Sequence, residues 1–84
     1  MKALTCTRWV AQPGDGTRYE VALVPREGGG LLLLLWDTHV ARVYRGNDGW
    51  SLVPTAGRWN RSMMSAALRI LSTVAVAADG SVTP

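Results

Sequence analysis

The sequence predicts an α+β fold, a mostly antiparallel sheet of about five strands with one C-terminal helix packed on a face. Short apolar or alternating segments separated by turn residues fill residues 2–54, which is typical of strands joined by hairpins. The most apolar segment, Leu31 to Trp36, precedes an alternating segment and a Gly-Asn-Asp-Gly turn. Residues 61–77 then place apolar side chains at helical spacing.

The length of 84 residues predicts a single domain over residues 1–80, followed by a flexible tail at 81–84. A domain of this size buries little more than half of the surface that its unfolded chain exposes, so its stability is marginal. Cys6 and His39 are the only cysteine and the only histidine in the sequence. We therefore expect no intrachain disulfide, no metal site and no cofactor, and stability must come from the apolar core or from a partner.

The net charge is +3, and arginine supplies all but one of the nine basic residues. Arginine suits phosphate and carboxylate partners through its planar fork of donors. A GC-rich genome produces the same richness in Ala, Arg, Gly, Leu and Val without any ligand, so both explanations stay open. The N-terminus turns polar by Thr5, unlike a signal peptide, and no segment reaches the ~20 apolar residues of a membrane helix. We expect a cytoplasmic protein with no membrane partner.

We expect a first antiparallel hairpin between residues 2–10 and 18–24, joined by the turn Gln-Pro-Gly-Asp-Gly. Cys6 lies on the first of these strands, where a buried thiol that packs as a small hydrophobe is the default expectation. The loop at residues 25–30 ends in three glycines, but it precedes a strand and no Lys-Ser or Lys-Thr follows it. We therefore expect a hairpin loop there and not a phosphate-binding loop.

Leu31 to Trp36 lacks alternation, so both faces of this strand are apolar. One helix covers only one face. The other face is expected to meet aromatic side chains of neighbouring strands or a second protomer, which makes a homodimer one candidate assembly.

Residues 40–45 alternate, and the turn after them predicts an antiparallel return through residues 50–53. Pro54 is expected to end that strand because it has no N–H to donate to the ladder. Asn60 is expected to cap a helix from Arg61 to about Ala77, with Gly80 after Asp79 at its C-terminal end. The apolar stripe of this helix comprises Met63, Met64, Ala67, Leu68, Leu71, Val74 and Ala75.

The second half of the chain resembles a pattern in small uncharacterised phage proteins, in which a T-x-V-A strand leads to a D-G turn, a G-W-x-T segment and a helix. The segments that carry the resemblance are Thr38-His39-Val40-Ala41-Arg42-Val43, Asp48-Gly49-Trp50-Ser51-Leu52 and Ala56-Gly57-Arg58-Trp59-Asn60-Arg61. In this chain Arg58 separates Gly57 from Trp59, and Asn60 stands where the family has a capping threonine. The resemblance implies a phage or mobile-element origin and carries no established chemistry.

Asp37 and His39 are candidates for an acid–base pair, because residues two apart on a strand share a face. General acid–base catalysis also needs a pocket and usually a third group, and the sequence supplies no further constellation. We therefore expect a structural turn pair and a protein that is not an enzyme.

Arginine and aromatic residues cluster from the alternating strand to the helix, and they form the main candidate site. Its residues are Arg42, Tyr44, Arg45, Trp50, Arg58, Trp59, Arg61 and Arg69. Arginine binds phosphates and aromatic rings stack on bases, and proteins that bind single-stranded nucleic acids combine these two kinds of contact. The same residues would also serve as hot spots in a protein interface, or the aromatic rings could belong to the core.

Size, missing catalytic motifs and the resemblance favour a phage-encoded inhibitor that occupies a surface of a host defence complex, as anti-CRISPR proteins do. Its partner would be a host protein or nucleoprotein complex. The alternatives are a small nucleic-acid-binding accessory protein and a virion assembly part. An exposed strand edge at residues 2–10 or 50–53 could also pair with a partner by strand addition.

Overall fold

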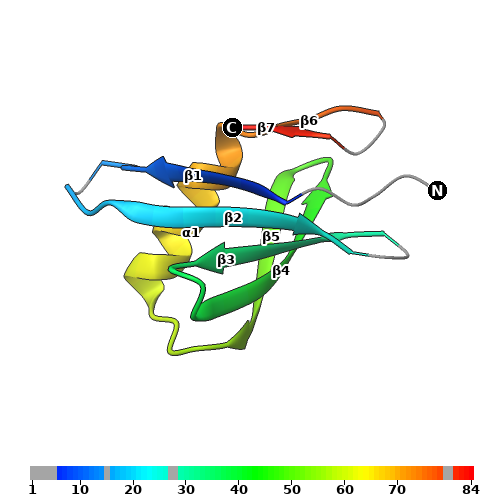
Figure 1. Cartoon of the computed structure of the whole chain (residues 1–84). Coiled ribbons are helices and arrows are strands. Elements are labelled where there is room, and N and C mark those ends of the chain that lie inside the picture. The colour runs from blue at the N-terminus through cyan, green and yellow to red at the C-terminus, as the bar shows by residue number, and fades with distance from the viewer. Residues whose placement is uncertain (1–5, 15, 27–28, 79–80) are drawn as a thin grey trace.

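A computed structural model describes residues 6–14, 16–26, 29–78 and 81–84 of the chain. Five strands pair in sequence order into one antiparallel sheet: β1 (Thr7–Ala11), β2 (Tyr19–Pro25), β3 (Leu31–Leu35), β4 (His39–Gly46) and β5 (Gly49–Ala56). They are followed by α1 (Arg61–Ser72) and by a short hairpin of β6 (Ala75–Val76) and β7 (Val82–Thr83). The predicted fold class is confirmed, and Figure 1 shows α1 lying across one face of the sheet.

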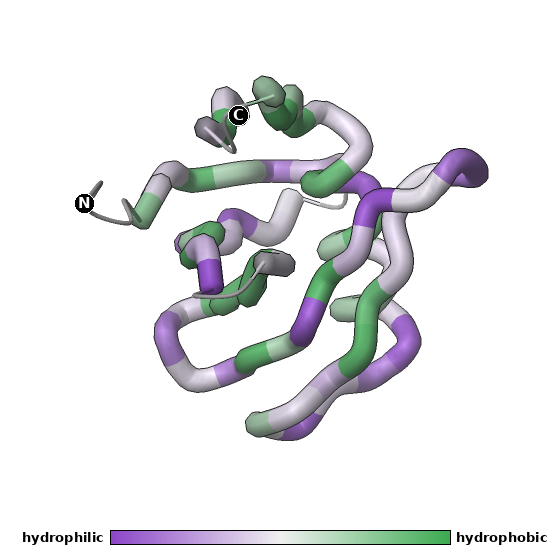
Figure 2. Tube along the Cα trace, turned by 90° about the vertical axis from the view of Figure 1, so that its right-hand side faces the viewer, coloured by the Kyte–Doolittle hydropathy of each residue, from purple (hydrophilic) through white to green (hydrophobic). Residues whose placement is uncertain are grey.

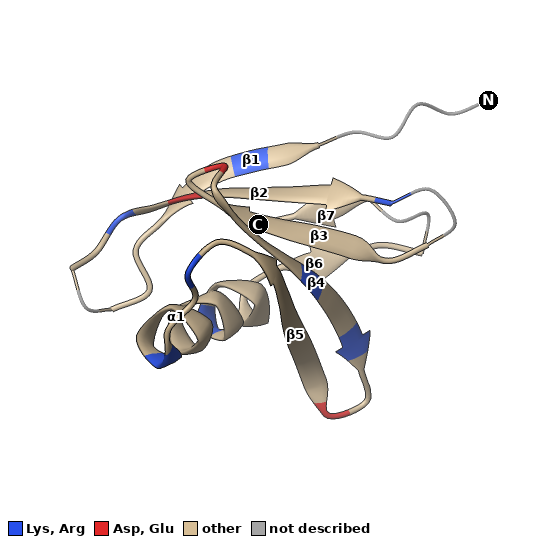
Figure 3. Ribbon diagram, turned by 90° about the horizontal axis from the view of Figure 1, so that it is seen from below, with Lys and Arg blue, Asp and Glu red and all other residues tan. Residues whose placement is uncertain are grey.

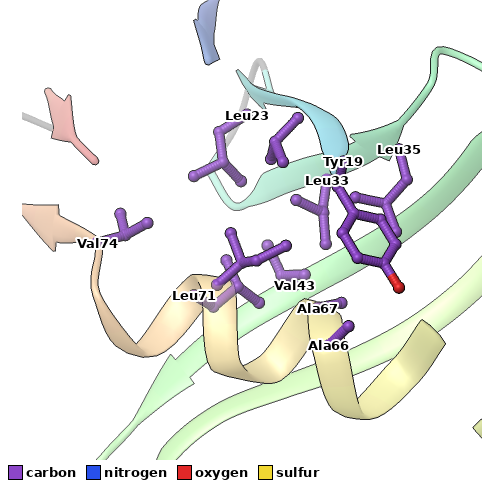
Figure 4. Close-up of a cluster of buried hydrophobic side chains, with 11 residues drawn as sticks. Tyr19, Leu23, Leu33, Leu35, Val43, Ala66, Ala67, Leu71 and Val74 are labelled. Carbon is purple, nitrogen blue, oxygen red and sulfur yellow. The ribbon is translucent and has the colours of Figure 1, made fainter. Parts of the chain in front are cut away.

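The inner face of the sheet, which packs on α1, follows from strand alternation. Leu33 pairs with Leu23 on β2 and with Ala41 on β4, so the three side chains share this face. Figure 4 shows the inner-face side chains meeting Ala67 and Leu71 of α1. Leu23, Leu33 and Leu71 are fully buried, and each such side chain contributes about 1.5–3 kcal/mol of burial free energy.

The opposite, outer face of the sheet is also largely apolar. Its apolar residues are Val10, Ala22, Val24, Leu32, Leu34, Val40 and Val53, as the strand pairing defines it. Among the described elements, α1 and the β6–β7 hairpin both pack against the inner-face core. Figure 2 shows apolar stretches, in green, recurring along the strands, with polar positions, in purple, both within strands and where the chain reverses. The strand Leu31–Leu35 is apolar on both faces, and α1 covers one of them.

Helix α1 begins where the sequence predicts it. The Asn60 side chain accepts a hydrogen bond of 2.8 Å from the Met63 backbone N–H, as an N-cap does. The helix ends at Ser72, and its expected extension to Ala77 is wrong. The Ser72 hydroxyl donates to the Arg69 carbonyl, and the Thr73 hydroxyl donates to the Ile70 carbonyl. Side chains therefore supply hydrogen-bond donors to two carbonyl groups of the last helical turn. The expected end at Gly80 lies outside the described residues.

Residues beyond α1 return to the core. Val74 is buried, and Ala75–Val76 pair with Val82–Thr83 as β6 and β7. Two of the four residues expected to form a flexible tail at 81–84 therefore lie in a short strand. Val76 and Val82 pack against the core cluster, which gives the short hairpin an apolar anchor.

Strand β5 continues through Pro54 to Ala56, so the expected end before Pro54 is wrong. It is an outermost strand of the five-stranded sheet, where the missing N–H of proline costs no ladder bond. A register shift between Val40 and Ala41 accommodates the longer pairing. Cys6 is exposed, contrary to the expected burial, because it precedes the first paired residue of β1. The first part of the predicted strand, residues 2–5, lies outside the described residues.

Candidate functional site

A groove runs along the exposed side of α1 beside the connection between β1 and β2. It has a volume of about 360 Å³ and is lined by Pro13, Arg61, Ser62, Ser65, Ala66 and Arg69. Arg61, Ser65 and Arg69 are four residues apart along α1, so they form a stripe on one side of the helix. The two arginine Cα positions are separated by about 12 Å along the helix axis. We call this feature the helix groove.

The positive charge of the helix groove is not neutralised within the described parts of the chain. Arg69 contacts the neighbouring loop through a weak 3.4 Å hydrogen bond from Nη1 to the Pro13 carbonyl. A Cβ on Gly14 would lie 3.2 Å from this nitrogen, so glycine lets the loop approach the guanidinium. No described carboxylate forms an ion pair with Arg61 or Arg69, and the first turn of α1 has no acidic residue. The N-terminal end of the helix dipole adds to this potential at Arg61, whereas Arg69 lies in the last turn, near the negative end.

The predicted arginine–aromatic cluster is divided among several places. Arg61 and Arg69 line the helix groove, and Arg58 is exposed in the connection that precedes α1. Arg42 and Tyr44 project from the outer face of β4, while Arg45 lies opposite Trp50 across the β4–β5 ladder. Figure 3 shows basic residues along α1 and its preceding connection, and again on β4.

The two tryptophans of the predicted cluster belong largely to the core. Trp50 and Trp59 are both half-buried and pack against the buried cluster. The indole N–H of Trp59 donates to the Ala56 carbonyl at 2.9 Å, which fixes the ring at the start of the helix segment. Tyr44, in contrast, is 47% exposed and is the most accessible ring of the predicted site.

A row of rings closes one end of the sheet. The ring centroids of Tyr19 and Trp36 are 4.8 Å apart, those of Trp36 and His39 are 6.2 Å apart, and those of His39 and Trp59 are 5.9 Å apart. The last two contacts are edge-on, a favourable arrangement for aromatic rings. His39 Nδ1 lies 2.9 Å from the Thr38 hydroxyl. The single histidine is therefore packed between two tryptophans.

Asp37 pairs with Arg8 of β1, through a 2.9 Å contact between a guanidinium nitrogen and a carboxylate oxygen. This hydrogen bond, together with the charge of Asp37, raises the pKa of Arg8 above its ordinary value. The pair is exposed and so contributes little stability. Within the described residues no hydrogen bond joins the Asp37 carboxylate to the His39 ring, and each has a partner of its own.

The β3–β4 turn and the segment before α1 meet closely. Trp36 and Asp37 both have positive φ, at 52° and 60°, and Thr38 N–H donates to the Leu35 carbonyl, as in a type I′ turn. A Cβ on Gly57 would lie 2.9 Å from the Thr38 carbonyl oxygen and from the His39 Cα. Because position 57 is glycine, the chain can pass close to this turn. The first residue of α1, Arg61, follows four positions later and lines the helix groove.

Sequence reasoning missed Pro13, Ser62, Ser65 and Ala66 as parts of the site. The spacing of Arg61, Ser65 and Arg69 carries a signal for a polar stripe, whereas nothing local indicates that Pro13 faces it. Among the described residues, no group of three or more His, Cys, Asp or Glu side chains could hold a metal ion. Within the same residues, no helix is both long and apolar enough to cross a bilayer.

No family model, curated protein or solved structure matches this chain.

Proposed function

We propose that this protein is a non-enzymatic binding module of phage origin, which inhibits a host defence complex by occupying an anionic surface of a nucleoprotein. The observation that carries the proposal is the helix groove, where Arg61 and Arg69 face solvent without a described carboxylate partner. The resemblance of residues 38–61 to small phage proteins supports the proposed origin. Such a module acts in the cytoplasm of the host.

The groove offers the donors that phosphate groups bind. A guanidinium donates two parallel hydrogen bonds to a phosphate or carboxylate, and such charge-assisted bonds are about twice as strong as neutral ones. The hydroxyls of Ser62 and Ser65 lie between the two arginines and supply further donors. Each phosphate bound in this way releases condensed counterions, so binding weakens as salt rises.

Direct binding to free nucleic acid is the second candidate, because the same arginines would track a backbone. Proteins that bind bare single strands also stack successive bases on aromatic side chains. Here Trp50 and Trp59 pack on the core, which limits the stacking surface beside the groove. This placement favours a nucleoprotein partner, where protein contacts supplement those to phosphate.

The test is retention of a host complex by the tagged protein, with and without nuclease. The variant is Arg61→Gln with Arg69→Gln, and the matched control is Arg18→Gln, an exposed arginine outside the groove lining. We expect a nucleoprotein to be retained after nuclease by the wild type and the control, and lost with the double variant. If nuclease removes everything that is retained, the nucleic-acid candidate replaces the inhibitor. Equal retention by the double variant would show that the groove is not the binding site.

A further inference from the structure

The outer face of the sheet has the composition of an interface. Ala22 on the central part of this face is 1% exposed, and Leu32 and Leu34 are half-buried. Val10 and Val53 on the two outermost strands are 52% and 50% exposed. Leu32, Leu34 and Val40 thus form an apolar centre on this face, whereas α1 and the β6–β7 hairpin occupy the other side of the sheet.

Two opposite charges lie at separate positions on this face. Glu20 projects from β2, opposite Val10, and Arg42 projects from β4 between Leu32 and Val53. No ion pair within the described residues involves either charge. The third charge, Arg8, is already paired with Asp37. The face thus presents one acidic and one basic group beside an apolar centre.

We propose that the outer face binds a second copy of this chain, with Glu20 of each copy paired to Arg42 of the other. A two-fold interface uses the same patch on both copies and must be self-complementary. The Trp36 N–H donates to the Glu20 carbonyl and Arg42 pairs with Leu32, so the two charges lie towards opposite ends of β3. A two-fold axis that lies in the plane of the interface and perpendicularly bisects the line between Glu20 and Arg42 exchanges their positions. Glu20 of each copy then faces Arg42 of the other copy.

The assembly is expected to be weak. Five strands at a spacing of about 4.8 Å, with about five residues each, give a face of roughly 20 by 17 Å. The two copies together would bury roughly 700 Å² of such a face, less than the ~1,200 Å² at which stable specific interfaces begin, so we expect only weak association, with a Kd of tens of micromolar or more. The helix groove is on the other side of the sheet and stays accessible in each copy. Formation of the dimer therefore does not require the groove to be occupied.

Sedimentation velocity over a range of protein concentrations tests the proposal through charge reversal. The wild type should shift from the 9.1 kDa mass of the chain towards twice that mass as its concentration rises. Glu20→Lys and Arg42→Glu should each weaken association by at least about tenfold, because each places like charges together. The double variant Glu20→Lys with Arg42→Glu should restore it.

An equimolar mixture of the two single variants gives a second test that requires no doubly changed chain. Each contact in that heterodimer joins a positive and a negative group, so the mixture should associate although neither variant does so by itself. Circular dichroism of each single variant checks that it is folded. A wild type that stays monomeric throughout, or single variants that associate like the wild type, would overturn the proposal. A mixture that fails to associate when both variants are folded would overturn the assigned charge pairs.

Discussion

Gly57 shows how one residue places the candidate site. Its φ is +87°, and its Cα passes so close to the β3–β4 turn that any Cβ would meet the backbone of Thr38 and His39. The next residues place the Trp59 ring against the core, cap the helix with Asn60 and begin the groove with Arg61. A change at this glycine therefore affects both stability and the position of the groove.

Gly57→Ala should lower the free energy of unfolding by about 3 kcal/mol, because left-handed backbone strain and a backbone clash add. Gly16→Ala is the matched control, since Gly16 also has positive φ, at +86°, but has no atom within 4 Å of an added Cβ. The control should lose only about 1 kcal/mol. Urea unfolding measures both, and equal losses would show that the close approach at Gly57 carries no cost.

Some features at this scale were accessible from the sequence and others were not. Asn60 caps α1 as predicted, since a capping side chain acts on its own next turn. The positive φ values of Trp36 and Asp37 were not predicted, because tryptophan rarely adopts this conformation and only the pairing of the flanking strands imposes it. Cys6 is exposed because pairing starts one residue later, at a boundary that alternation does not define.

Helix α1 joins the core to the candidate site, with one side on the sheet and another along the groove. Leu71 is fully buried against the inner face, whereas Leu68 on the same helix is 38% exposed. Both were predicted to lie on the apolar stripe. The buried side of α1 is thus shifted around the helix from the predicted stripe, since it includes Ala66 and Ile70 but not Leu68.

Leu71→Ala should destabilise the protein by about 2–5 kcal/mol, because the deletion leaves a cavity between helix and sheet. Leu68→Ala should cost less than about 1 kcal/mol, because its side chain remains partly in water. Thermal unfolding followed by circular dichroism compares the two directly. Similar losses for both would mean that the helix is rotated relative to the sheet from the arrangement described.

Asn60→Ala should cost about 1 kcal/mol through loss of the bond to Met63 N–H. Asn60→Asp keeps a capping oxygen and adds a negative charge at the positive end of the helix dipole. Its unfolding free energy should equal or exceed that of the wild type. An aspartate variant as unstable as the alanine variant would contradict the assigned cap.

Tertiary pairing decided the element boundaries that the sequence did not predict. Pro54 normally ends a strand, yet β5 is an outermost strand and tolerates the missing donor. Helical spacing continues to Ala75 in the sequence, but Val74 turns into the core and Ala75–Val76 pair with Val82–Thr83. Short paired strands of two residues carry no periodic signal of their own.

At the scale of the whole molecule, hairpin order and the amphipathic helix were enough to predict the architecture. The site was predicted as one arginine–aromatic cluster, whereas the fold puts Arg42 and Tyr44 on the outer face and Arg61 and Arg69 on the helix. Residues that the sequence groups into one cluster thus lie apart, because the fold places them on opposite sides of the sheet. Pro13, in contrast, lines the groove although it lies 48 positions before Arg61 in the chain.

The protein therefore has two surfaces with different chemistry: a cationic groove on α1 and a largely apolar outer face of the sheet. If both function as proposed, a dimer through the outer face carries two grooves directed away from each other. Two linked sites raise apparent affinity for an extended partner when geometry lets both engage. Variants of the outer face should then weaken retention of a large nucleoprotein more than they weaken binding to a short oligonucleotide.

The most direct test of the central claim is the salt dependence of binding to a short labelled single-stranded oligonucleotide, measured by fluorescence anisotropy. Loss of two phosphate contacts in Arg61→Gln with Arg69→Gln should reduce the slope of log affinity against log salt by about 1.4, at roughly 0.7 per contact. Arg18→Gln should leave that slope unchanged. A double variant with the wild-type slope, or a wild type whose affinity does not depend on salt, would contradict a phosphate-binding groove on α1.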